Sequence, residues 1–304
     1  MNAHFSLASD ALRSMIQHPI DRPPADHGNS FMPHRRLRAR HALLIAATVA
    51  GTACLTRVAA GQAQRVAHPA QATAPIHITW LGHAGFEIVS SGGTRLLIDP
   101  WIDGNSAAPA AYRDSARYAA AATRPAAILV THGHGDHDGD TPRLARISGA
   151  PVIATGDHLE AMKIPEGHYL SINIGGVQHV GDVEIHAVPA MHSVAPGHAL
   201  GFVLRFADGR TLYHTGDTWV FGDMSLIEQL FHPSIVLFGM GGGRAGEDPA
   251  TAAIAIRKYF HPRVIVPMHI GTLPPPFATE ADVRAAFRGD ARLRVLVPGT
   301  EATF

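Results

Sequence analysis

The sequence contains a single cysteine, Cys54, which lies near the start of the chain. Most of the chain therefore has neither a disulfide nor a thiolate ligand for a metal, and cysteine usage does not indicate the redox compartment. Long apolar runs are also lacking. The longest, Ala42–Leu55, falls short of the roughly 20 residues that a helix needs to cross a bilayer. We therefore expect no stable membrane span in the mature protein.

Basic runs are missing from the body of the chain. Residues 1–63 hold seven of the 25 Lys and Arg and three of the 25 Asp and Glu, which leaves 18 basic against 22 acidic residues in the rest. Affinity for nucleic acid comes mainly from neutralising phosphates with basic side chains. The composition therefore predicts no nucleic-acid partner. The partner we expect is a small-molecule substrate, and a homo-oligomer is compatible with the sequence.

The first 63 residues resemble an export signal. Residues 33–63 contain an arginine-rich stretch, an apolar core and then small residues, which are the three parts of a signal peptide. Cleavage is expected after Ala60 or Ala63, and Arg35-Arg36 is compatible with a twin-arginine route. These features predict a periplasmic or secreted protein. The alternative is a cytoplasmic protein with an N-terminal arm.

The remainder divides into a linker and one domain. Residues 64–75 are dominated by Ala, Gln and Pro and are typical of a linker. Residues 76–304 show apolar or alternating runs that predict strands, followed by strand–helix alternation. We expect strands at 76–81, 86–89, 94–98, 127–130, 151–154, 168–174, 183–188, 200–206, 210–214, 235–239 and 263–267, and helices at 114–122, 223–231, 249–260 and 280–288. This order favours two sheets packed face to face with helices outside.

The loop 131–137 carries the clearest chemistry in the sequence. It reads Thr-His-Gly-His-Gly-Asp-His and directly follows the predicted buried strand at 127–130. Neutral imidazoles and carboxylates are ligands for zinc, manganese and iron. We expect His132 and His134 to share one metal, and Asp136 and His137 to reach a second.

Three further residues of the same types follow other predicted strands. They are His192, Asp217 and His269. Alone, each would be explained equally well as a side chain that satisfies backbone groups at a strand end. Together with the loop they supply five imidazoles and two carboxylates, which is enough for two metals that share one carboxylate.

These motifs resemble the metallo-β-lactamase superfamily. The H-x-H-x-D-H pattern is that superfamily's metal motif, and the segments 80–84, 97–100, 214–218 and 267–272 are similar to the branch related to ascorbate-6-phosphate lactonase. The resemblance covers about residues 76–300 and implies an α/β fold, a four-layer αβ/βα sandwich. Carried over residue by residue, it implies one metal on His132, His134 and His192, a second on Asp136, His137 and His269, and Asp217 between them.

The resemblance and the chemistry of the residues predict the same activity. Two divalent ions, zinc or alternatively manganese or iron, would activate a water for attack on a small ester, lactone or phosphodiester. Asp136 can accept the proton of that water as well as bind metal. Relatives place the equivalent of His83 beside the metals, so it is expected to contact the substrate. The alternative for His83 is a structural turn residue.

Two other functions fit the same motifs. One is a non-catalytic metal-binding protein on the same fold, and the other is a β-lactamase-type amide hydrolase. The complete set of ligands argues against the first, and the segments at 80–84 and 267–272 fit the lactonase-like branch better than the second.

Residues around this site are predicted with open alternatives. Asp99 is expected to orient a ligand imidazole, His214 to be structural, and Asp248 and Pro249 to start a helix. The loop 239–244 is expected to be a flexible rim, with anion binding as the alternative. Aromatic residues that either wall a substrate cleft or pack in the core are Trp219, Phe221 and Phe277.

Overall fold

A computed structural model describes residues 74–304, except 244–245 and 275–276. The predicted export signal and nearly all of the linker lie outside the described residues, so these assignments stay predictions. Within the described part, no helix has the length and apolar character required to span a membrane.

The first sheet is mixed. It contains seven strands in the spatial order β13 (Glu301–Thr303), β1 (His77–Gly82), β2 (Gly85–Val89), β3 (Arg95–Ile98), β4 (Ala127–Leu129), β5 (Val152–Ala154) and β6 (Tyr169–Ser171). The pairs between β13 and β3 are antiparallel, and those from β3 to β6 are parallel. Strands β1, β2 and β3 form a β-meander.

The second sheet is mixed as well. It contains six strands in the order β12 (Val264–Met268), β11 (Ile235–Gly239), β10 (Thr211–His214), β9 (Leu200–Phe206), β8 (Val183–Pro189) and β7 (Val177–Val180). Here β10, β11 and β12 are parallel, and the pairs from β10 to β7 are antiparallel.

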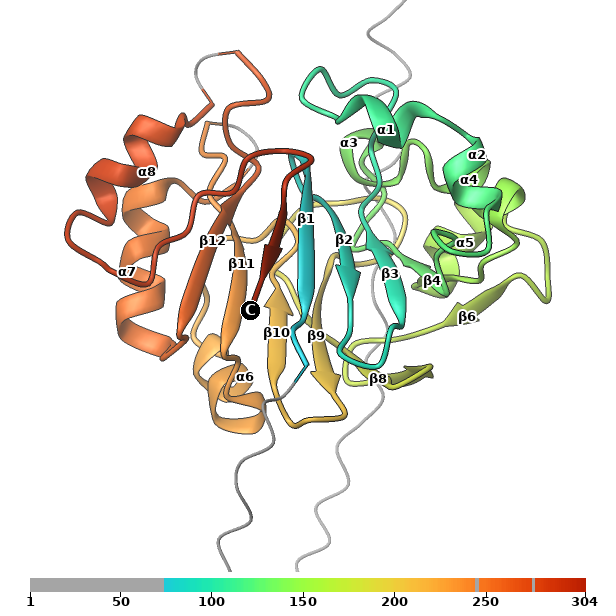
Figure 1. Ribbon diagram of the computed structural model, residues 1–304. Coiled ribbons are helices and arrows are strands. Elements are labelled where there is room, and N and C mark those ends of the chain that lie inside the picture. Colours follow the sequence, from blue (N-terminus) through green and yellow to red (C-terminus); the bar gives the residue numbers. More distant parts are fainter. Residues whose placement is uncertain (1–73, 244–245, 275–276) are drawn as a thin grey trace, which may run out of the picture. The chain divides into compact units, whose positions relative to one another are not determined.

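Helices cover the outer face of each sheet (Figure 1). The first sheet is covered by α1 (Ala110–Arg113), α2 (Ala116–Ala119), α4 (Thr141–Ser148) and α5 (Gly156–Ala161), while α3 (Gly135–Asp138) lies at its rim. The second sheet is covered by α6 (Met224–Phe231), α7 (Pro249–Tyr259) and α8 (Glu280–Ala286). The predicted four-layer αβ/βα sandwich is confirmed.

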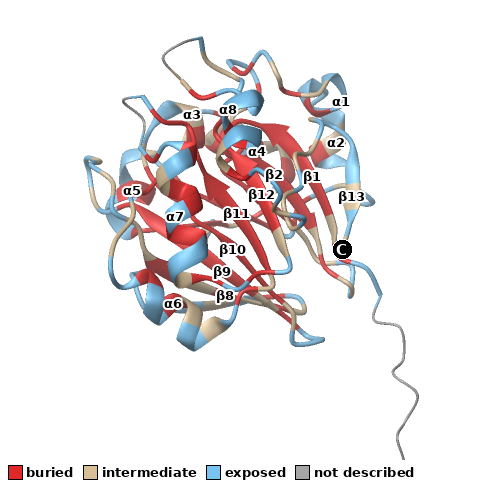
Figure 2. Cartoon of the chain, turned by 90° about the vertical axis from the view of Figure 1, so that its left-hand side faces the viewer, coloured by how far each residue is buried: buried red, intermediate tan, exposed pale blue. Residues whose placement is uncertain are grey.

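Alternation along the strands builds two layers of core. On β3, Leu96 and Ile98 belong to the cluster between the sheets, whereas Leu97 packs in a second cluster under the helices of the first sheet. Ile128 on β4 lies in that second cluster too. The strands are therefore buried on both faces, as parallel strands covered by helices are, and Figure 2 shows them as a buried interior.

Strand direction brings the predicted site together. In the first sheet β1, β3 and β4 run the same way, because β2 is antiparallel to both of its neighbours and β3 is parallel to β4. In the second sheet β8, β10, β11 and β12 share a direction by the same reasoning. Each predicted ligand follows the C-terminal end of one of these strands, so the ligands of one sheet gather at one of its edges.

Some predicted elements differ in the structure. Of the helix expected at 114–122 only the short α2 is present, and of the strand expected at 168–174 only β6. Two strands were not predicted: β13, which pairs with β1, and β7, which pairs with β8. Neither has a strong local signal, because β7 and β13 are short strands with largely exposed residues.

The start of α7 has the predicted cap. The carboxylate of Asp248 accepts hydrogen bonds from the backbone nitrogens of Ala250 (2.9 Å) and Thr251 (3.1 Å), and Pro249 is the first helical residue. The preceding Glu247 was not singled out by the sequence. It is only 2% exposed, and neither of its carboxyl oxygens has a hydrogen-bond partner within the described part of the chain. Burial, and then the neighbouring Asp248 carboxylate, raise the pKa of Glu247 to about 8.

This raised pKa predicts a pH-dependent cost to stability. Between about pH 4.5 and 8 the folded protein holds a proton on Glu247 that the unfolded chain has released, so stability falls as the pH rises through that window. Glu247→Gln removes the charge. We expect the variant to be more stable than wild type by roughly 3–5 kcal/mol at pH 9 and by less than about 1 kcal/mol at pH 5.

Urea unfolding of the full chain at both pH values measures this difference. The matched control is Glu166→Gln, which makes the same substitution at an exposed position. An effect of Glu247→Gln that did not depend on pH would contradict the prediction.

Candidate metal centre

The loop after β4 packs closely on His158 because Gly133 has no side chain. A side chain at Gly133 would place its Cβ only 2.4 Å from Cε1 of His158. His158 is buried, and its Nε2 lies 3.1 Å from Oδ2 of Asp138 at the end of α3. His158 therefore supports the loop from behind. The sequence did not single it out, because nothing near His158 in the chain marks its contact with a loop more than 20 residues earlier.

Three predicted imidazoles form a first group. Nε2 of His132 lies 3.0 Å from Nδ1 of His134, and Nε2 of His192 lies 3.2 Å from the same nitrogen. His192 comes from the loop after β8, so both sheets contribute to the group.

A second group contains Asp136, His137 and His269. Nε2 of His269 lies 3.4 Å from Oδ2 of Asp136, and Nε2 of His137 lies 3.9 Å from that oxygen. His269 follows β12 with φ of +64°, a left-handed conformation that costs energy for a residue with a side chain. The surrounding structure therefore holds His269 in a backbone conformation that this residue would not prefer by itself.

Asp217 lies between the two groups. Its Oδ1 is 3.4 Å from Nε2 of His137, and its Oδ2 is 3.3 Å from Nε2 of His269 and 3.9 Å from Nε2 of His192. The turn that presents Asp217 depends on Gly216, where φ is +60° and an added Cβ would lie 2.4 Å from the Leu200 carbonyl oxygen. The structure thus brings all seven predicted ligands together.

The geometry of both groups fits metal ions. In a tetrahedral site with bonds of about 2.0–2.1 Å, two ligand atoms lie roughly 3.3 Å apart, and the distances above run from 3.0 to 3.9 Å. Nε2 of His137 and Nε2 of His269 are buried without a hydrogen-bond partner among the described residues. Buried polar atoms normally have a partner, and a metal ion would provide one for each.

Asp99 lies behind the predicted ligands and holds the loop 131–137 by hydrogen bonds. Its carboxylate accepts hydrogen bonds from the backbone nitrogen of Thr131 (2.8 Å), from the Thr131 hydroxyl (2.6 Å) and from Nδ1 of His137 (2.8 Å). The last contact leaves Nε2 of His137 facing the site. The contact of Asp99 with an imidazole of the site, which its predicted role requires, is therefore present.

Burial and charge set the protonation states. Burial lowers the pKa of His132 to about 2, so this imidazole is neutral, the form that binds metal. Burial would raise the pKa of Asp217, but His137 and His269 outweigh it and hold that pKa well below its usual range. For His269 burial is again outweighed, and the carboxylates of Asp217 and Asp136 raise its pKa to about 9. The centre therefore attracts positive charge.

Comparison with known proteins identifies the family. The family model described as beta-lactamase superfamily domain matches residues 77–269. The chain belongs to the metallo-β-lactamase superfamily. It is 39% identical over 254 residues to a UPF0173 metal-dependent hydrolase of Anaeromyxobacter dehalogenans, covering 78% of this chain and 90% of the relative. A UPF0173 metal-dependent hydrolase of Myxococcus xanthus is 36% identical over 269 residues, covering 83% and 91% of the two chains.

A solved structure supports the same assignment. Igni18, described as a novel metallo hydrolase from the archaeon Ignicoccus hospitalis, superposes with a TM-score of 0.66 and 29% identity. The match covers 76% of this chain and 98% of Igni18. The family of metal-dependent hydrolases predicted from the sequence is thereby confirmed, whereas the lactonase branch is a finer assignment that these similarities do not address.

His83 occupies a buried position in this superfamily member. It is 1% exposed, and its Nε2 lies 2.8 Å from Oδ2 of Asp136. Its ring centroid is 3.6 Å from that of His269. Burial lowers the pKa of His83 to about 4, although the hydrogen bond to Asp136 opposes it. The structure thus gives His83 a contact with a predicted ligand and little surface for a substrate.

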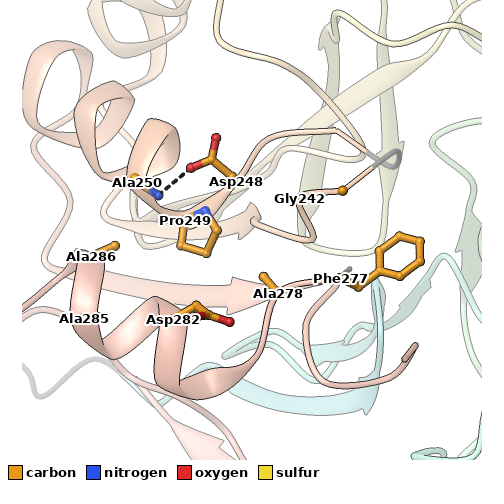
Figure 3. Close-up of a pocket in the computed structure, with 10 residues that line it drawn as sticks. Gly242, Asp248, Pro249, Ala250, Phe277, Ala278, Asp282, Ala285 and Ala286 are labelled. Atoms are coloured by element: carbon orange, nitrogen blue, oxygen red, sulfur yellow. Dashed lines mark hydrogen bonds between the residues drawn. The ribbon is translucent and has the colours of Figure 1, made fainter. Parts of the chain in front are cut away.

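The structure also places the remaining residues that the sequence analysis named. His214 is structural, as predicted. Its Nε2 donates to the Ala84 carbonyl oxygen at 3.0 Å, which ties β10 to the β1–β2 turn. Phe221 packs against the core. Phe277 lines a cavity of about 470 Å³ between the starts of α7 and α8 (Figure 3). Trp219, by contrast, is 57% exposed.

The loop 239–244 lies against the metal centre. A Cβ on Gly241 would be 2.4 Å from Nδ1 of His269, so the loop backbone packs directly on that imidazole. Arg244, the residue on which the anion-binding alternative depended, lies outside the described residues, so that alternative is untested.

The contacts of Asp99 predict its effect on metal binding. In Asp99→Asn the amide cannot accept the same three hydrogen bonds with a full negative charge, so His137 loses its orientation. We expect metal affinity to fall about 10–100-fold, measured by competition with a chromophoric chelator.

Asp182→Asn is the matched control. Asp182 also accepts several hydrogen bonds, from Ser90, Thr94 and Gly92, but none of these residues belongs to the metal centre. Equal affinities for Asp99→Asn and wild type, in a folded protein, would show that Asp99 does not orient the ligand.

Proposed function

We propose that this chain is a dinuclear metal-dependent hydrolase. The observation that carries the proposal is the position of Asp217, whose carboxylate faces His192 of the first group and both His137 and His269 of the second. A carboxylate so placed can bridge two ions. The first ion would be held by His132, His134 and His192, and the second by Asp136, His137 and His269.

Charge supports a pair of divalent ions. Three ionised carboxylates, those of Asp99, Asp136 and Asp217, lie at or directly behind the centre, and each has a lowered pKa even though burial opposes ionisation. Ionised carboxylates buried in this way are costly unless positive charge lies close to them. Two divalent ions would supply that positive charge.

Bound ions of this kind supply a water with a lowered pKa and polarise the oxygen of a carbonyl or phosphoryl group. Zinc is the ion we expect, with manganese or iron as alternatives. The chain's own contribution is to hold the ligands apart at fixed distances and to accept a proton. Asp136 is suited to that second role, because its carboxylate is partly exposed at the site.

The structure leads to a different role for His83 from the one that the sequence indicated. Because Nε2 of His83 is bonded to Asp136, we propose that His83 fixes the orientation of this carboxylate, where the sequence had indicated direct contact with the substrate. It would then be a positioning residue.

The substrate we propose is a small ester, lactone or phosphodiester, with lactone opening suggested by the lactonase-like motifs. The test is hydrolysis by the full chain, loaded with zinc or manganese, on panels of esters, lactones and phosphodiesters. We expect hydrolysis that a chelator abolishes and that added metal restores.

Asp217→Asn should lower kcat/KM at least about 100-fold, because loss of a ligand should cost more than loss of an outer contact. The exposed Asp223 gives the control, since Asp223→Asn removes a carboxylate away from the centre. Hydrolysis that survives both the chelator and Asp217→Asn would contradict the proposal. A metal-loaded protein inactive on all panels would favour the non-catalytic alternative.

A further inference from the structure

Two large apolar side chains are exposed beside the metal centre. Met191 and Trp219 are each 57% exposed, and we call this pair the apolar lip. Leaving such side chains in water forgoes about 25 cal/mol for each Å² that could be buried. Exposed apolar surface of this kind often marks a binding site.

The backbone fixes the lip relative to the predicted ligands. Met191 directly precedes His192, and Trp219 follows Asp217 by two residues. The backbone nitrogen of Trp219 donates to the Met191 carbonyl oxygen at 2.9 Å. The backbone nitrogen of Met191 donates to the Thr218 hydroxyl, also at 2.9 Å. The lip is therefore held beside the centre by two hydrogen bonds between the segments that carry ligands.

The other large hydrophobic residues that are exposed in the described part of the chain are Ile174, Val177, Leu226, Leu230, Ile254 and Val297. Leu226 and Leu230 are on α6 and Ile254 is on α7. Both helices cover the outer face of the second sheet (Figure 1). None of these six residues is adjacent in the chain to a predicted ligand. The lip is thus distinguished by its position as well as by its exposure.

The segments that carry the lip contain no guanidinium or ammonium group. Neither 189–199 nor 217–222 has a Lys or Arg. Within these two segments a phosphate or sulfate group would find no guanidinium or ammonium partner. An alkyl chain or an aromatic ring would instead pack on the indole face and the flexible thioether of the lip.

We propose that the apolar lip binds the non-reacting alkyl or aryl group of the substrate, which makes the substrate an ester or lactone with an apolar substituent. This inference rests on the proposed hydrolase function and narrows it. The reacting carbonyl then lies at the metal centre while the substituent extends over Met191 and Trp219. A sugar phosphate would not use this surface.

A series of 4-nitrophenyl esters from acetate to octanoate measures the contribution of the lip. Full burial of one methylene is worth about 0.8 kcal/mol, a factor of about four. For a half-exposed lip we expect kcat/KM of the metal-loaded full chain to rise about twofold per added methylene. Trp219→Ala should flatten that dependence. Leu230→Ala, which truncates a side chain 64% exposed on α6, should leave the slope unchanged.

Binding without turnover gives an independent readout. Trp80 is only 6% exposed and Trp101 is partly buried, so Trp219 is the most exposed of the three tryptophans. Octanoate should shift the fluorescence emission of the full chain to shorter wavelength, whereas acetate should not. The shift should be lost in Trp219→Ala and retained in Leu230→Ala.

The two measurements separate the two proposals. Absence of hydrolysis together with a Trp219-dependent shift would overturn the hydrolase function and keep the apolar site. Hydrolysis with a flat chain-length series and no shift would overturn the lip and keep the hydrolase. A rising series that Trp219→Ala leaves as steep as before would also overturn the lip.

Discussion

Three buried or half-buried carboxylates at one edge of a sandwich are the constraint on which the rest of this structure depends. Asp99, Asp136 and Asp217 are ionised although burial opposes it, and this is tolerable only where positive charge is close. The surrounding imidazoles provide nitrogen atoms at distances that suit metal ions. The hydrolase chemistry that we propose thus depends on the same carboxylates whose burial lowers the stability of the fold.

The fold supplies that site by strand direction. Strands β1, β3 and β4 of one sheet, and β8, β10 and β12 of the other, each end where a residue of the centre begins. Loops at strand ends can carry such residues because the buried strands behind them are rigid. Asp99 and His269 have a left-handed backbone conformation. This conformation is strained for residues with a side chain, and it occurs here at two residues of the site. Packing between the sheets offsets that cost.

Much of this could be predicted from the sequence, for identifiable reasons. The strand expected at 200–206 matches β9 and the helix expected at 249–260 matches α7 to within one residue, because both have strong periodicity. The residues that gather at the site stood out in the sequence because each follows a predicted strand. Contacts across long separations were not. His83 with Asp136, and His158 with Gly133, depend on side chains that only the folded chain brings together. The exposure of Trp219 was likewise left open, since an aromatic residue in a loop fits the core or a cleft equally well.

The number of metal ions per chain tests the central claim most directly. Native mass spectrometry of the full chain, saturated with zinc and then desalted, gives that number without any assumption about the substrate. We expect two ions in wild type and one in His134→Ala, because His134 belongs only to the first group. A wild-type chain that holds one ion or none at saturation, while correctly folded, would contradict a dinuclear centre bridged by Asp217.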